Sequence, residues 1–555
     1  MTARGGKISA QTPSPRVGGW RNPYAFLRHL YGTKLYRLTL PRHAVMPTGQ
    51  IPTDMWPGDA NRGAIIVNGD FELAGNAIRD AEAPWLADGV SDDWLATISI
   101  FDWLRDLRAV GNEAARLRGR ALIHRWIDTH GDWNQTAWQP GELGARIANW
   151  IGHCEFLTGG SDTSFQQAFY HSLVRQTRHL RRVARYAAPG TPAILALKGL
   201  IFASLAFENN KLLERSLGGL NEEIERQLLG DGGTVMRNPS CQLDYVRHMI
   251  DIRSALRNGQ QAVPHWVQTA IDRMAPMLRF FRHSDGGLAL FNDSREEEGW
   301  LIDVVLTRSE ARGKPLESAP HSGFERLTAD RTTVIMDVGK PPPKGYDSMA
   351  HAEALSFEMS VGKERLVVNC GALHGDSAAW ITPQRTTAAH STVTVEDVNS
   401  AEILGKGGFS HLPVKLSIDR KELDGDTWIE ATHDGYQRTF GLVHSRRLYL
   451  GANGGDLRGE DTLTGKGNHK FVVRFHLHPD VRASMVQEGN AILLRLPSGS
   501  GWRFRASGGV MALQESVYLG SGNSVKRTEQ IAISSATQLG ASQVKWAFYQ
   551  LSSDY

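Results

Sequence analysis

The chain has 555 residues, with 62 basic and 59 acidic side chains and a net charge of +3. This balance gives no global signal for nucleic-acid binding, and the length predicts two or three domains rather than one core. No apolar run approaches the roughly 18 residues of a membrane span.

The N-terminus is positively charged but lacks the apolar h-region of a Sec signal peptide. The three cysteines are far apart and form neither a CxxC pair nor a disulfide framework. Both features predict a soluble cytoplasmic protein in a reducing compartment. Residues 1–20, rich in Gly, Pro and Ser, are expected to be a disordered lead-in. Residues 21–90 are expected to form an irregular segment packed on the next domain.

Residues 91–315 show helical periodicity. In the segment 142–157, Leu143, Ile147 and Trp150 recur at the spacing that draws one apolar stripe along a helix. Similar segments follow, separated by Gly, Pro or Asn. Repeated helices with short loops predict a bundle, a solenoid or a closed ring of helical hairpins. No exact repeat is visible, which argues against a strict repeat array.

Short alternating runs replace the helical pattern after a linker at 311–323. Through residues 325–555, these runs are separated by Gly, Asp or Asn at the roughly 8–12-residue spacing of antiparallel sheets. Helices first and strands second predict separate α and β domains, with a β-sandwich as the second.

Two histidines lie at the edges of predicted strands. His351 precedes an alternating run at 355–361, and His390 precedes another at 392–395. Asn369 and Arg385 are close to them in sequence. A polar cluster on a β scaffold is a candidate site.

The order of a helical and a β domain, together with HAEALSFEMSVGKERLVVNCG (351–371) and RTTAAHSTVTV (385–395), resembles the heparinase II/III-like family. DGGTVMRNP (231–239) and GELGARIANW (141–150) extend the resemblance into the helical part. It is most similar to an alphaproteobacterial-type branch without a settled substrate. The resemblance implies a multidomain α + β fold, in which an N-terminal α/α toroid is followed by an antiparallel β-sandwich.

The activity that this resemblance implies is β-elimination in a uronic-acid-containing polysaccharide or oligosaccharide. A cationic or amide group neutralises the sugar carboxylate, a base removes the C5 proton, and an acid protonates the leaving oxygen. The resemblance also implies a periplasmic or envelope location. Two alternatives remain open at this point: a catalytically inactive glycan-binding protein, and a structural protein of envelope polysaccharide assembly. The sequence does not predict the oligomeric state.

The sequence departs from the family pattern at three places. Met349 stands where the family has its first histidine, Cys241 stands where it has a tyrosine, and the segment 190–200 lacks the family's Asn-His pair. The candidate catalytic residues are therefore non-standard: His351, Tyr245, Asn238 and Arg385. Asn238 could instead cap a helix, and Arg385 could form a salt bridge with Glu353.

The resemblance also implies a metal site. His351 and His390 match zinc-binding positions of relatives, with Asn369 in place of the family's Asp, which predicts a weak structural zinc site. The alternative is a hydrogen-bonded polar seam inside the sandwich. No other cofactor is expected.

Candidate substrate-binding residues are basic. The run 175–185 places several arginines on one predicted helix side, where they would attract an anionic polymer. The alternative for this stripe is a solvated face paired with carboxylates. The substrate-binding set is Arg175, Arg178, Arg182 and Arg237.

Overall fold

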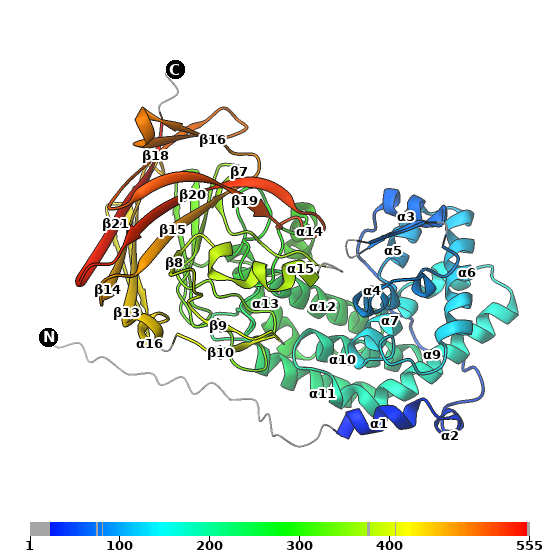
Figure 1. The fold of residues 1–555 in the computed structure, drawn as a ribbon. Coiled ribbons are helices and arrows are strands. Elements are labelled where there is room, and N and C mark those ends of the chain that lie inside the picture. The colour runs from blue at the N-terminus through cyan, green and yellow to red at the C-terminus, as the bar shows by residue number, and fades with distance from the viewer. Residues whose placement is uncertain are drawn as a thin grey trace.

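A computed structural model of the chain describes residues 23–551 apart from 74–75, 80, 375–377, 406 and 414. The lead-in expected at 1–20 lies outside the described residues. Figure 1 shows a helical N-terminal half beside a β-rich C-terminal half. The predicted fold class, a toroid followed by an antiparallel sandwich, is confirmed. In the described part of the chain, no helix has both the length and the apolar character needed to cross a bilayer.

The helical half contains most of the α-helices. They are α1 (Pro23–Tyr31), α2 (Lys34–Arg37), α3 (Ala60–Val67), α4 (Asp92–Ser99), α5 (Leu104–Val110), α6 (Glu113–His130), α7 (Pro140–Gly152), α8 (Cys154–Thr158), α9 (Thr163–Val183), α10 (Thr191–Ala206), α11 (Asn210–Gln227), α12 (Pro239–Asn258), α13 (His265–Phe280) and α14 (Gly299–Arg308). A small hairpin, β1 (Phe71–Leu73) with β2 (Asn76–Ile78), precedes α4.

Local sequence sets the ends of several helices. Ser91, Asn112 and Asp162 each accept a hydrogen bond from a backbone N–H in the first turn of the helix that they precede. Helix α10 is apolar on most sides and packs against α7, α11 and α12. Gly199 of α10 faces Gly144 of α7, where a Cβ would lie 2.6 Å from the Gly144 Cα. These two glycines allow the helix backbones to approach closely.

The β half forms two sheets. Its strands are β3 (Ser318–Ala319), β4 (Phe324–Ala329), β5 (Thr332–Asp337), β6 (Phe357–Val361), β7 (Glu364–Val368), β8 (Val393–Val395), β9 (Glu402–Ile403), β10 (Phe409–His411), β11 (Leu416–Leu423), β12 (Asp426–His433), β13 (Leu442–Leu450), β14 (Asp456–Gly465), β15 (Lys470–Leu477), β16 (Arg482–Val486), β17 (Ala491–Arg495), β18 (Gly501–Ser507), β19 (Val510–Tyr518), β20 (Lys526–Ala536) and β21 (Gly540–Gln550). Two short helices, α15 (Ala378–Ile381) and α16 (Gln437–Phe440), interrupt them.

One sheet has the order β11-β12-β13-β14-β21-β18-β17-β16, and the other has β19-β20-β15-β7-β6-β5-β4-β3, with β8 paired to β15. All these pairs are antiparallel. An aromatic core lies between the sheets, where Phe357 stacks on Trp546 with ring centroids 5.5 Å apart. Short β9 and β10 pair separately.

Buried polar contacts join the two halves. Arg237, just before α12, pairs with Asp337 at the end of β5. Asp231 accepts hydrogen bonds from the backbone N–H and the hydroxyl of Ser322. His283, beyond α13, contacts Glu358 of β6 at 3.0 Å. These contacts fix how the toroid faces the nine-stranded sheet.

Candidate functional site

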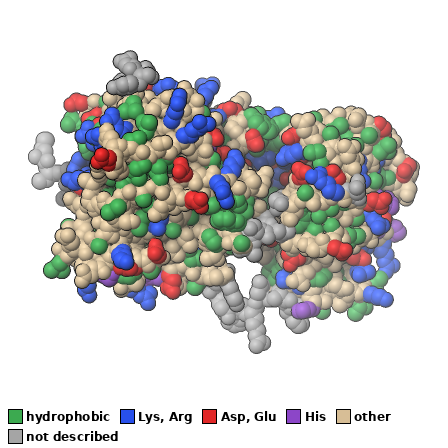
Figure 2. Space-filling view, turned by 45° about the horizontal axis from the view of Figure 1, so that its top comes forward, with side chains coloured by type: hydrophobic (Ala, Val, Ile, Leu, Met, Phe, Trp, Pro, Cys, Tyr) green, Lys and Arg blue, Asp and Glu red, His purple; other side chains and the backbone are tan. Residues whose placement is uncertain are grey.

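Polar side chains from both halves meet where the toroid faces the sandwich. Figure 2 shows the surface as two lobes with a depression between them. We call these polar side chains the junction site, which consists of Asp293, Arg295, His351, His374 and Arg385. The first two follow α13, His351 precedes β6, and the last two lie between β7 and β8.

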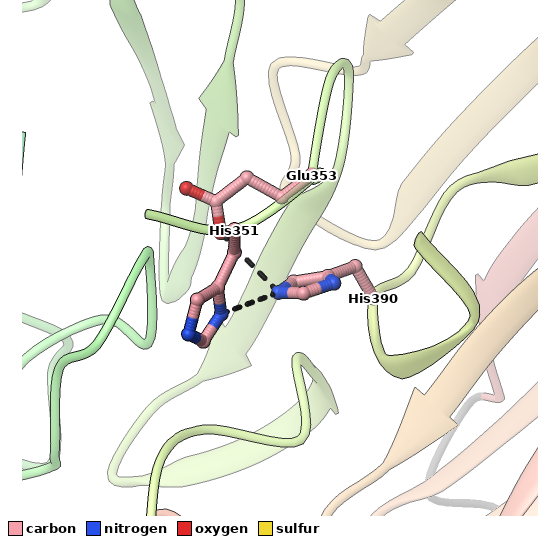
Figure 3. A group of neighbouring side chains, drawn as sticks. All are labelled: His351, Glu353 and His390. Atoms are coloured by element: carbon pink, nitrogen blue, oxygen red, sulfur yellow. Dashed lines mark hydrogen bonds and ion pairs between the residues drawn. The ribbon is translucent and has the colours of Figure 1, made fainter. Parts of the chain in front are cut away.

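His351 and His390 form a hydrogen-bonded pair (Figure 3). Nδ1 of His390 lies 2.7 Å from the carbonyl oxygen of Thr386, so this nitrogen carries the hydrogen. Nε2 of His390 then accepts from Nδ1 of His351 at 3.0 Å. Nε2 of His351 is left with a lone pair, and it is buried without a partner among the described residues. This chain of contacts fixes one tautomer of each ring.

Burial keeps both rings neutral. It lowers the pKa of His390 to about 4. For His351, burial together with the neighbouring His390 and Arg385 lowers the pKa well below its ordinary value. At pH 7 both imidazoles are therefore uncharged, and His351 presents a hydrogen-bond acceptor.

Glu353 completes this cluster. Its carboxylate lies 3.4 Å from Nε2 of His390, and both of its oxygens accept from the backbone N–H of Asn292. Burial raises the pKa of Glu353 well above its ordinary value, which favours the protonated carboxyl. A nearby cation, such as a metal ion, would be needed to keep this carboxylate ionised. One ligand atom from each of His351, Glu353 and His390 lies within 4.8 Å of the others. This donor set fits zinc.

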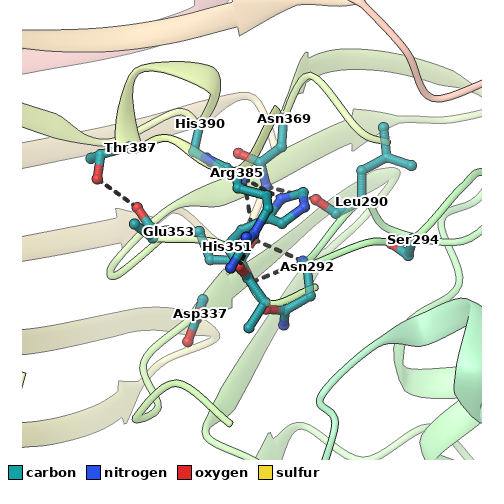
Figure 4. Close-up of polar contacts among 12 residues, drawn as sticks. Leu290, Asn292, Ser294, Asp337, His351, Glu353, Asn369, Arg385, Thr387 and His390 are labelled. Carbon is teal, nitrogen blue, oxygen red and sulfur yellow. Dashed lines mark hydrogen bonds and ion pairs between the residues drawn. The ribbon is translucent and has the colours of Figure 1, made fainter. Parts of the chain in front are cut away.

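Asn369, the third zinc ligand expected from the sequence, has other contacts. Its side-chain nitrogen donates to the Leu290 carbonyl, and its oxygen accepts from the backbone N–H of Ser391 (Figure 4). The amide therefore braces the loops around the histidines. Glu353 occupies the place beside His390 that the sequence interpretation gave to Asn369.

Asp293 and His374 form the second half of the junction site. Nε2 of His374 lies 3.8 Å from Oδ1 of Asp293. Burial raises the pKa of Asp293 to about 7, although Arg295 and Arg385 oppose the shift. Burial, helped by the nearby Arg295, lowers the pKa of His374 to about 4. Near neutral pH this pair offers a partly protonated carboxyl beside a neutral imidazole.

Several buried polar atoms of the junction site have no hydrogen-bond partner among the described residues. They are Nε2 of His351, Nε2 of His374, Oδ1 of Asp293 and Nε of Arg295. Buried polar groups are nearly always satisfied by protein, water or ligand. A polar ligand or ordered water is therefore needed here.

The structure places the other sequence-derived catalytic candidates differently. The Tyr245 hydroxyl is fully buried inside the toroid and donates to Gln227 at 3.3 Å. The Asn238 side chain accepts from the backbone N–H of Cys241, which confirms the helix-cap interpretation. Arg385 reaches the junction site, but its guanidinium donates to the carbonyls of Ala350 and Gly408 rather than to Glu353.

The predicted substrate-binding arginines lie outside the junction site. Arg237 is buried, with its guanidinium occupied by Asp337 and by backbone carbonyls. Arg175 pairs with Asp132, and Arg182 donates to Thr39. Helix α9, which carries Arg175, Arg178 and Arg182, lies on the side of the helical half away from the sandwich (Figure 1). These contacts match the alternative of a helix face with local partners.

Sequence reasoning missed Asp293, Arg295 and His374. The only signal for the first two was the polar run NDSR at 292–295 directly after the apolar GLALF at 287–291. His374 had no regular pattern around it. Neither feature distinguishes a site residue from an ordinary loop residue, because the partners come from distant segments.

Comparisons with known proteins agree with this architecture. The family described as heparinase II/III-like, C-terminal, matches residues 311–547. FtsZ-localized protein C of Caulobacter vibrioides (strain NA1000 / CB15N) is 30% identical over 543 residues, covering 94% of this chain and 93% of that protein. A crystal structure of heparinase III has a TM-score of 0.73 at 13% identity, covering 95% of this chain and 89% of that chain. Heparan sulfate lyase HepC from Pedobacter heparinus has a TM-score of 0.58 at 16% identity, covering 91% and 86% respectively.

Proposed function

Because this chain belongs to the heparinase II/III-like family, we propose that it binds a uronic-acid-containing polysaccharide or oligosaccharide at the junction site and cleaves it by β-elimination. One observation carries the proposal. Buried polar atoms of Asp293, Arg295, His351 and His374 converge from both halves without partners among the described residues. A sugar with hydroxyl and carboxylate groups would satisfy them.

The proposed chemistry uses His374 as the base and Asp293 as the acid. His374 takes the proton from C5 of the uronate, and protonated Asp293 gives a proton to the oxygen that leaves C4. The C5–H and C4–O bonds break, and a C4=C5 double bond forms. The 3.8 Å between Nε2 of His374 and Oδ1 of Asp293 suits two groups that act on adjacent atoms of one ring.

The remaining residues of the junction site would position the sugar. Nε of Arg295 can donate to the uronate carboxylate, whose neutralisation makes the C5 proton more acidic. Arg385 adds positive charge nearby, and Nε2 of His351 can accept from a sugar hydroxyl. A zinc ion held by His351, His390 and Glu353 would supply a structural crosslink between two loops of the sandwich. With zinc bound, the His351 proton would be on Nε2, which would then donate to the sugar hydroxyl instead of accepting from it.

A second candidate function is glycan binding without cleavage. Met349 and Cys241 stand where the family resemblance places a histidine and a tyrosine, and Tyr245 is buried away from the junction site. The relative from Caulobacter vibrioides is named as an FtsZ-localized protein rather than as a lyase. Carried to this chain, that name supports a non-catalytic protein that is localised with FtsZ. A structural role in envelope polysaccharide assembly is a further alternative, in which the protein neither cleaves nor binds a glycan.

Cleavage is tested by incubating the full chain with heparin, heparan, alginate, hyaluronan and glucuronans. The readout is the ultraviolet absorbance of the unsaturated uronate that elimination creates. With a polymer that gives this signal, His374→Ala and Asp293→Asn should each lower the rate by roughly 100-fold or more. Binding of the same polymer is measured in parallel.

The exposed pair His124 and Asp128 on α6, 3.3 Å apart, provides matched control substitutions. His124→Ala and Asp128→Asn should leave the rate unchanged. Equal losses in both pairs would overturn the assignment of His374 and Asp293. Binding without absorbance for any polymer would instead support the non-catalytic glycan binder, and neither binding nor absorbance would support the structural role.

A further inference from the structure

The outward face of the eight-stranded sheet carries a second group of aromatic and basic side chains. Strands β13, β14 and β21 lie on the side of the sandwich away from the helical half (Figure 1). They border a groove of about 840 Å³. We call it the sheet-face groove and define it by six of its lining residues: Trp428, Arg447, Tyr449, Arg458, Arg505 and Lys545.

The strand register aligns these side chains in rows that cross the sheet. Trp428 is opposite Tyr449, which is opposite Arg458. Ala547 comes next, and then Arg505. The Trp428 and Tyr449 rings lie 5.1 Å apart, and the Arg458 guanidinium lies 5.3 Å from the Tyr449 ring. The small Ala547 leaves the middle of the row open between two arginines.

The next row is charged and begins at Glu430, which is opposite Arg447 and accepts from its guanidinium at 2.7 Å. Arg447 is opposite Glu460, which is opposite Lys545. The Arg447 and Lys545 side chains are 50% and 64% exposed, whereas Glu460 is 20% exposed. Arg458 is 56% exposed above Asp456, which is 18% exposed. Glu430, which is 43% exposed, neutralises Arg447 at the surface. Lys545 and Arg458, in contrast, project beyond the less exposed Glu460 and Asp456 and present positive charge to the solvent.

The backbone of this face is not available to a ligand. The strands β13, β14, β21 and β18 are paired with neighbours on both sides, so a peptide cannot add to the sheet as a further strand here. Recognition must use side chains alone. Aromatic rings beside exposed arginines and a lysine suit a ligand with ring faces and regularly spaced anionic groups.

We infer that the sheet-face groove is a second binding site for an anionic glycan chain, separate from the junction site. The class of ligand rests on the proposed function, whereas the site itself rests on the rows of side chains. Sugar rings pack on Trp428 and Tyr449, and carboxylate or sulfate groups pair with Arg458, Arg505 and Lys545. Two sites on one chain would hold long polymers more tightly than short ones.

The test measures affinity of the full chain for long heparin, for short heparin and hyaluronan oligosaccharides, and for uncharged dextran by titration calorimetry. The groove variants are Trp428→Ala and the double variant Arg505→Ala/Lys545→Ala. Each should bind long heparin about tenfold more weakly. The matched control, Lys526→Ala/Arg527→Ala, removes two exposed charges from β20 of the other sheet and should bind as the wild type does.

The variants separate this inference from the proposed function. The junction variant His374→Ala should lose cleavage while keeping the groove contribution to long-chain affinity. Groove variants that lose affinity in a protein with no junction activity would support the groove and overturn the proposed function. Unchanged affinity in the groove variants, or no binding of any charged glycan by the wild type, would overturn the groove.

Two further results would name a different occupant and overturn the inference. Polyglutamate binding that is as tight as heparin binding and insensitive to Trp428→Ala would indicate an acidic peptide. Self-association of the wild type in sedimentation velocity, lost in Arg505→Ala/Lys545→Ala, would indicate a second copy of this chain.

Discussion

Arg237, just before α12, and Asp337, at the end of β5, form a buried ion pair that joins the toroid to the sandwich. The same guanidinium donates to the carbonyls of Ser322, Gly323 and Lys340. Asn292 continues the connection, because its side chain donates to the Arg237 carbonyl and accepts from the backbone N–H of His351. Arg237 thus positions the junction site without belonging to it.

Removing the guanidinium of Arg237 should strongly destabilise the protein. Arg237→Met leaves Asp337 buried without its partner, which costs roughly 3–5 kcal/mol in free energy of unfolding. Urea denaturation followed by tryptophan fluorescence measures the change. The exposed Arg79, paired with Asp70 and Glu72, is the control, and Arg79→Met should leave the midpoint unchanged. Equal effects of the two substitutions would contradict the role of Arg237.

The raised pKa of Asp293 predicts that the free energy of unfolding depends on pH. The folded protein holds the Asp293 proton up to a pKa of about 7, whereas the unfolded chain releases it near pH 4. The folded state binds more protons between these values, so stability falls as the pH rises from about 4 to about 7. Asp293→Asn should therefore be more stable than the wild type at pH 8, by roughly 2–4 kcal/mol.

At pH 4 the two proteins should have similar stabilities, because Asp293 is protonated in the folded chain and about half protonated in the unfolded chain, which leaves little of the free-energy difference. Thermal unfolding at the two pH values measures the difference. A constant difference between variant and wild type from pH 4 to pH 8 would rule out a raised pKa at Asp293.

Zinc should bind the cluster of His351, Glu353 and His390. A free zinc concentration about 100 times Kd would add about 2.7 kcal/mol to the free energy of unfolding. Metal analysis and thermal unfolding, before and after incubation with zinc, measure binding. Glu353→Gln should weaken zinc binding, since it removes the anionic ligand. His478→Ala is the control and should leave zinc binding unchanged, because His478 lies beside Glu296 and Asp480, outside the cluster. No zinc in either preparation would leave the histidines as a hydrogen-bonded pair.

Any side chain at Gly459 of β14 should lower the stability of the fold. A Cβ there would lie 2.0 Å from the ring of Trp546, which is held in the sandwich core by a hydrogen bond to Asp461. Gly459→Ala should therefore cost roughly 1–3 kcal/mol through overpacking. No atom of the described residues lies within 4 Å of a Cβ added at Gly218 of α11, so Gly218→Ala should stabilise the helix by about 0.5–1 kcal/mol. Changes of the same sign would contradict this packing argument.

The sequence predicted the architecture well because periodicity is a local property. A helical repeat before residue 315 and alternating runs after 325 require only near neighbours in the chain, and both halves form as expected. The Asn-Pro step at 238–239 likewise predicted a helix cap from adjacent residues. The family resemblance depended on the same local stretches around His351 and His390.

The candidate site was only partly predictable. His351 and His390 were identified and lie together, but the third member of their cluster is Glu353 rather than Asn369. A catalytic role for Tyr245 requires that α12 turn this side chain toward the junction site, and sequence spacing does not reveal how a helix is rotated within the toroid. The sequence predicts Arg237 as a substrate contact because nothing near it in the chain indicates its partner Asp337, 100 residues later.

The sequence alone therefore determined the fold class, the order of the two halves and the family. Tertiary structure alone decided which polar atoms lack a partner within the described part of the chain, and this places Asp293 and His374 rather than Tyr245 at the junction. The physical reason is that a hydrogen bond or a burial cost depends on what surrounds a group in space. Those surroundings come from segments far apart in the chain, so local composition carries no record of them.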